Sequence, residues 1–340
     1  MKARALVVPR ADGEATRREL ADAGWLRTDL RIASVKGTLV LPVLDDAPIP
    51  AEWGSLGSAE FEPRPEGGPS DYRDLLAWSA AEKDLLPRSF DIVGDVVLVR
   101  LPRELESRGG EIGEALRRFV PHARTVGWDR GVHGVERRRT IERLAGDGGW
   151  ATVHRENGLE LSVDLGRAYF SPRLAREHAL VAAEVRPGET VYDLCCGVGP
   201  FAVHIARDGR ARAVVAVDVN PDAISLLRQT LQRYPFGSRV RQEVAPIEGF
   251  LPSAPPCDRA ILNLPHEGIK YAPSVARTVG PGGRLHLYEV VARNELADRG
   301  HVIAERLEPR GAWDAIAQRI VHPYSPDSDL IAFTLARAAE

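Results

Sequence analysis

The chain has 340 residues, more than one domain usually holds, so two or three compact units are expected. Apolar residues make up 44% and charged residues 27%, which is ordinary for a soluble globular protein. The N-terminus turns polar at once and no apolar run approaches the ~20 residues of a membrane span, so we expect a cytoplasmic protein with no membrane segment. Cys195, Cys196 and Cys257 are too few for a disulfide framework, and with no histidine–cysteine cluster apparent we expect no metal.

The net charge of −3 does not itself indicate a nucleic-acid partner, but the arginines are unevenly placed. Between residues 117 and 143, eight arginines face three acids, a local excess of five positive charges. Such a segment can bind phosphates. It can equally reflect the use of arginine as the default cation, because the chain has only four lysines, Lys2, Lys36, Lys83 and Lys270.

The first fifty residues predict a small βαβ-type unit. Residues 4–8 and 38–44 are apolar runs typical of strands, and residues 11–23 between them have helical spacing. Pro42 favours an edge strand for the second run. Residues 47–70 are rich in proline and glycine, which predicts a flexible linker. We therefore expect an N-terminal module over residues 1–46.

A second α+β unit is expected over residues 71–165. Residues 71–86 and 104–120 have helical patterns, and the Val-rich residues 91–101 predict a strand. Residues 151–164 alternate apolar and polar side chains across Asn157-Gly158, which is a strong signal for a β-hairpin.

From residue 166 onward, strands alternate with helices. The expected order is helix 174–185, strand 190–194, helix 200–207, strand 213–218, helix 222–233, strand 259–262, helix 272–279 and strand 284–288. This alternation predicts an α/β fold with a mostly parallel, doubly wound sheet over residues 166–340. Ligands of such sheets bind outside the carboxyl ends of the strands.

The loop after the first of these strands has the features of a cofactor site. Gly197 and Gly199, followed by Pro200, let the backbone approach a ligand closely, and the acidic Asp193 precedes them. Residue 202 is not glycine, so NAD is the weaker alternative. A lone G-x-G is most often only a tight turn, but Asp218 ends the next strand, where an acid can accept ribose hydroxyls. The combination favours S-adenosyl-L-methionine.

These residues resemble a known family, the archaeal and eukaryotic tRNA (guanine-37-N1)-methyltransferases. The matching segments are Leu86-Pro-Arg-Ser-Phe-Asp-Ile-Val-Gly-Asp95, Glu111-Ile-Gly-Glu114, His154-Arg-Glu-Asn-Gly158, Tyr169-Phe-Ser-Pro-Arg-Leu-Ala-Arg-Glu177, Asn263-Leu-Pro265, Gly280-Pro-Gly-Gly283 and Tyr324-Ser-Pro326. The resemblance implies a Rossmann-like methyltransferase domain preceded by two smaller RNA-binding modules. It also implies that the partner is tRNA, with the N-terminal module at the elbow and the catalytic part at the anticodon loop, and that the enzyme is a monomer.

The chemistry of the expected reaction sets the catalytic roles. N1 of guanine carries a proton, so a base must remove it while a cation or hydrogen-bond donor stabilises charge at O6. By the resemblance, Glu177 is the base, Arg137 contacts O6 with Arg139 as the fallback, and Asn263 holds the guanine edge. An exposed ion pair of Glu177 with Arg173 is the structural alternative. The target base must leave its stack to reach the methyl group.

The resemblance also implies the remaining binding residues. Substrate contacts are expected from Arg137, Arg139, Arg173 and Pro265. Cofactor contacts are expected from Tyr169, His178, Asp193, Gly197, Gly199, Pro200, Asp218, Val219, Glu243 and Asn263.

The chain departs from the family pattern at three places. Cys195-Cys196 stands where Phe-Ala is more usual, and His178 replaces an arginine. The usual third acidic position is Gln242-Glu-Val-Ala245, so Glu243 is the nearest candidate for the adenine contact. Two other functions stay open: a wybutosine-pathway transferase or bifunctional enzyme acting on a tricyclic guanine derivative, and an inactive RNA-binding protein.

Overall fold

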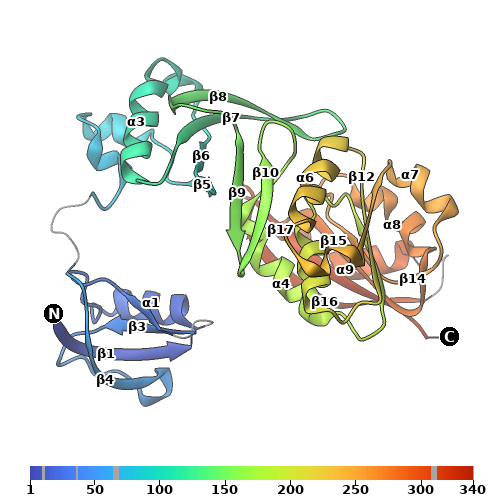
Figure 1. The fold of residues 1–340 in the computed structure, drawn as a ribbon, viewed down its shortest axis with the longest axis horizontal. Coiled ribbons are helices and arrows are strands. Elements are labelled where there is room, and N and C mark those ends of the chain that lie inside the picture. The colour runs from blue at the N-terminus through green and yellow to red at the C-terminus, as the bar shows by residue number, and fades with distance from the viewer. Residues whose placement is uncertain (10–11, 36, 64–68, 308–311, 340) are drawn as a thin grey trace. The chain divides into compact units, whose positions relative to one another are not determined.

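The computed structural model describes residues 1–9, 12–35, 37–63, 69–307 and 312–339. The chain divides into two compact units, Met1–Ser70 and Asp71–Glu340, each described by itself (Figure 1). Among the described residues, none of the helices is both long and apolar enough to cross a membrane.

The first unit is an antiparallel sheet in the order β2-β3-β1-β4 with one helix packed on it. Its elements are β1 (Lys2–Pro9), α1 (Gly13–Asp22), β2 (Ala33–Val35), β3 (Thr38–Pro42) and β4 (Ser55–Glu60). Leu6, Leu20 and Leu41 are fully buried between the sheet and α1.

Two expectations for this unit are corrected. The strand with Pro42 is not at an edge, because β3 lies between β2 and β1; Pro42 is tolerated as its last residue, opposite Ala5. The expected linker is not wholly irregular, since β4 pairs with β1 from Lys2↔Glu60 to Val7↔Ser55. Most side chains of β4 are exposed, so its order comes from backbone pairing that the composition does not reveal.

The second unit begins with a smaller sheet in the order β5-β6-β7-β8. Its elements are α2 (Ala80–Asp84), β5 (Phe90–Val93), β6 (Val96–Val99), α3 (Gly109–Phe119), β7 (Thr125–His133) and β8 (Arg138–Gly146). The expected strand 91–101 is a hairpin that turns at Gly94, whose φ is +55°. The expected helix 71–86 is only the 3-10 turn Tyr72–Leu75 and the short α2.

The main sheet follows the order β13-β12-β11-β14-β15-β17-β16, parallel through β15 and antiparallel at β17 and β16. Its strands are β11 (Thr190–Leu194), β12 (Ala213–Asp218), β13 (Val240–Val244), β14 (Cys257–Leu262), β15 (Val279–Ala292), β16 (Trp313–Pro323) and β17 (Ser328–Arg337). The helices are α4 (Ala175–Glu184), α5 (Pro200–Asp208), α6 (Pro221–Leu231), α7 (Ile247–Phe250), α8 (Gly268–Ala276) and α9 (Leu296–Leu307). The expected Rossmann-like methyltransferase fold is confirmed.

The predicted hairpin is formed by β9 (Ala151–Glu156) and β10 (Leu159–Asp164), with Asn157 and Gly158 both at positive φ. Its apolar side chains share a core with α6, and Thr230 of α6 accepts a hydrogen bond from the Ser162 amide at 2.8 Å. The hairpin therefore packs on α6, and its core also includes Val93, Val96 and Leu98 of the middle sheet.

Candidate active site

The glycine loop joins β11 to α5 at the carboxyl edge of the main sheet. Cys195, Gly197 and Gly199 all have φ between +56° and +76°. A Cβ atom at Gly199 would also collide with Leu227, so both the backbone and the packing require glycine there. Pro200 is the first residue of α5, where its fixed φ and missing amide hydrogen suit the start of a helix.

Asp193 lies beneath this loop with an unused hydrogen-bond acceptor. Its carboxylate accepts from the Ala202 amide at 3.1 Å, while Oδ1 is buried without a partner in the described structure. Burial raises the pKa of Asp193 to about 7. A ligand that brings positive charge would relieve this situation, and the ammonium group of S-adenosylmethionine is such a ligand. The residues present fit the expected cofactor.

Asp218 connects the glycine loop to the end of β12. Its two carboxylate oxygens accept from the Gly197 amide at 2.7 Å and the Asn220 amide at 2.9 Å. Burial raises the pKa of Asp218. Each oxygen has capacity for a further hydrogen bond, as from a ribose hydroxyl beside Val219.

The Asn263-Leu264-Pro265 loop follows β14, the strand next to β11, and lies at the same edge of the sheet. Two backbone hydrogen bonds hold it: Gly268 donates to Leu264 at 2.7 Å and Val290 donates to Pro265 at 3.1 Å. In the part of the chain that the structure describes, the Asn263 amide has no hydrogen-bond partner. It remains available to a ligand.

Arg137 reaches this edge from the loop between β7 and β8. Its guanidinium carbon lies 5.1 Å from the centre of the Tyr169 ring. Its charge also acts on both loops: burial lowers the pKa of His266 and Arg137 lowers it further, while burial raises the pKa of Cys195 to about 12 against the opposing effect of Arg137. Within the described residues, the Arg137 guanidinium makes no hydrogen bond or ion pair.

Arg139 differs from Arg137 although it also lies over Tyr169, at 4.8 Å. It is buried, pairs with Asp129 and donates to the Phe170 carbonyl at 3.0 Å. These bonds occupy its two terminal nitrogens, while its buried Nε has no partner among the described residues. The structure therefore favours Arg137 over Arg139 as the group available to a substrate.

Glu177 is buried at 4% exposure in α4. It accepts hydrogen bonds from Tyr288 Oη at 3.1 Å and from Arg319 at 2.9 Å, two residues that sequence reasoning did not identify. The alternative ion pair with Arg173 is not formed, because Arg173 pairs with Asp91 at 2.8 Å. Glu177 thus has an internal cation of its own.

His178 lies in a buried cluster, and its Nε2 has no hydrogen-bond partner among the described residues. Its Nδ1 is 2.8 Å from Glu156 Oε1, and its ring packs on His204 and Phe201. Burial lowers the pKa of His204 to about 4. The side-chain oxygen and nitrogen atoms of Glu156, His178 and His204 lie within 4.8 Å of one another, a buried grouping that the sequence did not predict. These residues are too far apart in the sequence for spacing to reveal them.

Glu243 lies on β13 opposite Val217, the residue before Asp218. Its carboxylate accepts from Arg241 Nε at 2.7 Å, on the same strand. The pKa of the Cys195 thiol is raised by burial, then by the charges of Asp218 and Asp193, and to a smaller extent by that of Glu248 of α7. The sequence alone could not distinguish Glu243 from Glu248, because both lie within or just after the segment predicted to hold the third acidic contact.

Comparisons with known proteins agree with this geometry. Residues 152–308 match the TRM5/TYW2 methyltransferase domain, residues 72–149 the TYW2 N-terminal domain and residues 5–52 the tRNA methyltransferase 5 N-terminal domain. The chain is 32% identical over 286 residues to tRNA (guanine(37)-N(1))-methyltransferase Trm5b of Pyrococcus abyssi, covering 84% of this chain and 83% of that protein.

Two solved structures are similar over nearly the whole chain. The crystal structure of Trm5b from Pyrococcus abyssi has a TM-score of 0.72 at 28% identity and covers 99% of both chains. The complex of aTrm5 and tRNALeu has a TM-score of 0.71 at 27% identity, covering 98% of this chain and 99% of that one. With this similarity in sequence and structure, the chain belongs to the Trm5 family of tRNA (guanine(37)-N(1))-methyltransferases.

Proposed function

We propose that this protein transfers a methyl group from S-adenosylmethionine to N1 of guanine 37, on the 3′ side of the tRNA anticodon. The observation that carries the proposal is that three features lie at one edge of the main sheet: the glycine loop, the Asn263 amide and the Arg137 guanidinium, the last two without partners among the described residues. The Trm5b relative carries this reaction in its name, and the solved aTrm5 complex contains tRNA.

The residues present can perform the steps that methylation of N1 requires. When bound, S-adenosylmethionine would supply the methyl group as an electrophile for N1. Glu177 takes the N1 proton, Arg137 stabilises the charge at O6 and Asn263 hydrogen-bonds the guanine edge. Tyr169, Asp193, Gly197, Gly199, Pro200, Asp218 and Val219 would surround the cofactor.

We further propose that the first unit contacts the tRNA elbow and that the enzyme acts as a cytoplasmic monomer. The match of residues 5–52 to the Trm5 N-terminal domain supports the elbow contact. Because β4 completes the sheet of this unit, the deletion that tests it is residues 1–70. The truncated protein should bind tRNA more weakly while its rate at saturating tRNA is largely kept. Unchanged affinity would contradict the elbow contact, and light scattering tests the monomer.

The reaction is tested by incubating the protein with S-adenosylmethionine and an unmodified tRNA transcript bearing guanine 37. Digestion and mass spectrometry should detect 1-methylguanosine, and its signal should vanish when guanine 37 is replaced by adenine. The Glu177→Gln variant should lose activity by about 10²–10⁴-fold, the usual contribution of a general base. Full activity of that variant would remove Glu177 from the chemistry.

The match of residues 72–149 to the TYW2 N-terminal domain keeps a second function in view. The enzyme would then act on a tricyclic guanine derivative at position 37, alone or in addition to guanine. A tRNA carrying 4-demethylwyosine, digested in parallel, distinguishes the two. Methylation of that substrate but not of guanine would replace the primary assignment.

A further inference from the structure

The segment Tyr324-Ser-Pro326 matches the family pattern but has no role in the site described above. It lies in the turn between β16 and β17. Tyr324 is 51% exposed, so its ring does not belong to a hydrophobic core. A single exposed aromatic side chain is ordinary on a protein surface. This ring, however, has a defined partner beside the active site.

The partner is His266, which directly follows the Asn263-Leu264-Pro265 loop. The Tyr324 Oη lies 2.9 Å from His266 Nε2, and the two ring centres are 5.4 Å apart with an angle of 69° between the rings. In an edge-to-face arrangement of this kind, each ring covers only a small part of the other. The pair therefore presents aromatic ring faces next to the loop that carries Asn263.

The register of the main sheet places the turn at the same edge as the glycine loop. Strand β17 is antiparallel to both β15 and β16, so β16 ends at the edge where β14 and β15 end. Val290 of β15 donates to the Pro265 carbonyl at 3.1 Å. Val290 also pairs with Leu330 of β17, which pairs with His322 of β16. A continuous row of backbone contacts thus joins the Pro265 loop to the residues just before Tyr324.

The turn that carries Tyr324 is held by its own hydrogen bonds. The Tyr324 amide donates to the Ser328 carbonyl at 3.0 Å, and the hydroxyl groups of Ser325 and Ser328 are 2.6 Å apart. Arg293 donates to the Pro326 carbonyl at 3.0 Å. These bonds fix the backbone on both sides of the exposed ring.

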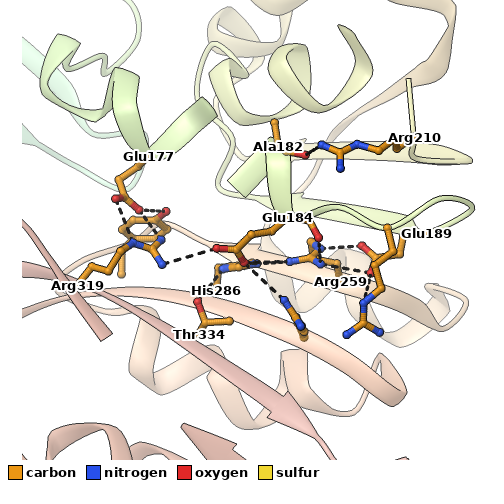
Figure 2. A network of polar contacts seen from close by, with 12 residues as sticks. Glu177, Ala182, Glu184, Glu189, Arg210, Arg259, His286, Arg319 and Thr334 are labelled. Carbon is orange, nitrogen blue, oxygen red and sulfur yellow. Dashed lines mark hydrogen bonds and ion pairs between the residues drawn. The ribbon is translucent and has the colours of Figure 1, made fainter. Parts of the chain in front are cut away.

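Strand β16 is itself fixed to α4 by ion pairs. Arg319, five residues before Tyr324, lies 2.9 Å from Glu177 and 3.7 Å from Glu184 (Figure 2). Glu184 lies 3.8 Å from the fully buried Arg259 (Figure 2). The ring of Tyr324 is therefore carried by an ordered backbone, so little conformational entropy is lost when a ligand packs against it.

The chemistry of the pair suits a base better than a phosphate group. Burial lowers the pKa of His266, the charge of Arg137 lowers it further, and Glu267 opposes both effects. The imidazole is therefore uncharged at neutral pH, and the phenol of Tyr324 supplies no cation either. Neutral ring faces are the surfaces on which the unpaired bases of RNA loops stack.

We propose that Tyr324 and His266 form a stacking platform for the base of a nucleotide that adjoins the target guanine in the anticodon loop. The inference deepens the proposed function and rests on it. When the target base leaves its stack, its neighbours lose a stacking partner, and the two rings replace that partner. Neither ring takes part in the transfer of the proton or of the methyl group.

The test is a binding cycle that removes the ring and the base separately and together. The affinity for tRNA is measured with S-adenosylhomocysteine present, so that no methyl transfer occurs. The wild type and Tyr324→Leu are each tested with intact tRNA and with two tRNAs that have an abasic nucleotide at position 36 or 38.

Loss of the contacted base should weaken binding to the wild type by about fivefold or more, as should loss of the ring with intact tRNA. Because the ring and the base act on each other, the two losses should not add at one of the two positions. General damage to the protein would weaken binding of all three tRNAs equally. Losses that add at both positions would overturn the proposal.

Tyr324→Phe separates stacking from a polar contact. This variant keeps the ring and loses the hydrogen bond to His266, so its affinity should still depend on the same base. If Tyr324→Phe loses that dependence as completely as Tyr324→Leu, the hydroxyl group makes the contact and the stacking platform is wrong.

Phe236→Leu is the matched control for removal of an aromatic ring. Tyr234 and Phe236 form another aromatic pair, with ring centres 4.8 Å apart, in a turn that leads into the start of β13. They therefore lie at the opposite edge of the main sheet. This variant should depend on the bases at positions 36 and 38 as the wild type does. A changed dependence would contradict a platform located at Tyr324.

His266→Ala keeps the proposal testable if Tyr324→Leu does not fold. It removes the other ring together with the hydrogen bond that orients Tyr324. Its dependence on the contacted base should be smaller than that of the wild type, and an unchanged dependence would count against the platform.

The binding cycle and the methylation assay fail in different ways. If the wild type forms 1-methylguanosine but the losses of affinity add at both positions, the inference is wrong while the proposed function stands. If the wild type forms no 1-methylguanosine, the proposed function fails and the inference falls with it.

Discussion

The charged groups beneath α4 and those at the glycine-loop edge of the same sheet are paired to very different extents. Beneath α4, Arg259 is fully buried yet makes bonds to Glu189, His286 and a backbone carbonyl. At the edge, Asp193 has a buried oxygen without a partner, and within the described residues Arg137 forms no ion pair. The first region is complete within the chain, whereas the second lacks partners that ligands can provide.

The contrast distinguishes residues that stabilise the structure around the site from residues that are available to bind ligands. A buried polar group that is fully bonded contributes to one defined packing, and removing its partner costs stability. A group that is left unpaired within the chain contributes little to folding, and its removal costs binding or rate. Arginines 137 and 139, two residues apart on one hairpin, fall on opposite sides of this division.

The largest expected effect is a loss of folding stability. Arg139→Ala leaves buried Asp129 without its main cation and should lower the free energy of unfolding by about 3–5 kcal/mol, measured by urea denaturation. Arg100 pairs with the same Asp129 at 3.3 Å but is 72% exposed, so Arg100→Ala should cost less than about 1 kcal/mol. Equal losses of unfolding free energy in the two variants would contradict the distinction between buried and exposed arginine partners.

Arg137→Ala tests a residue that is available to bind the substrate. Removing a group that stabilises charge only in the transition state should lower the methyl-transfer rate by about 10²–10³-fold, with an unchanged melting temperature. Arg138→Ala is the matched control, because the side chain of Arg138, next to Arg137 in the sequence, is already bound to Glu136 and Asp222. A stability loss without a rate loss in Arg137→Ala would place this residue among the structural arginines.

The smallest expected effect concerns Asp193 and pH. Since its carboxyl group has a pKa of about 7 in the free protein, a cationic ligand that prefers the ionised form must displace a proton below that pH. The affinity for S-adenosylmethionine, measured by calorimetry, should rise by up to about tenfold per unit between pH 5 and 7 and then level off. Asp193→Asn should bind more weakly and flatten this dependence; a flat wild-type curve would separate Asp193 from the ligand.

Local sequence signals were sufficient for the central part of the fold and for the cofactor loop. Strands β11 and β12 have the predicted bounds, because each is a short, mostly apolar run that is followed by a polar or glycine-containing turn. The positive φ of Gly197 and Gly199 agrees with the close backbone approach inferred from their spacing. These features depend only on residues that are close in the sequence, so short sequence segments are enough to predict them.

Features that depend on distant pairing were not predictable. Strand β16 was missed because most of its side chains are exposed and do not alternate, so its order comes from pairing with β17. Arg319 lies on that strand, 142 positions from Glu177. The Glu156–His178–His204 cluster likewise assembles from β9, α4 and α5, which only the tertiary packing brings together.

The first and last parts of the first unit pair with each other in one sheet. Its outer strand β4 pairs with β1 so that Lys2 lies opposite Glu60, and the unit starts and finishes at the same place. A single length of backbone joins it to the residues that follow. A unit built this way can be gained, exchanged or lost through one fusion or deletion in a gene, without rethreading either partner. A fusion or deletion at this one junction would therefore add or remove the whole four-stranded sheet at once.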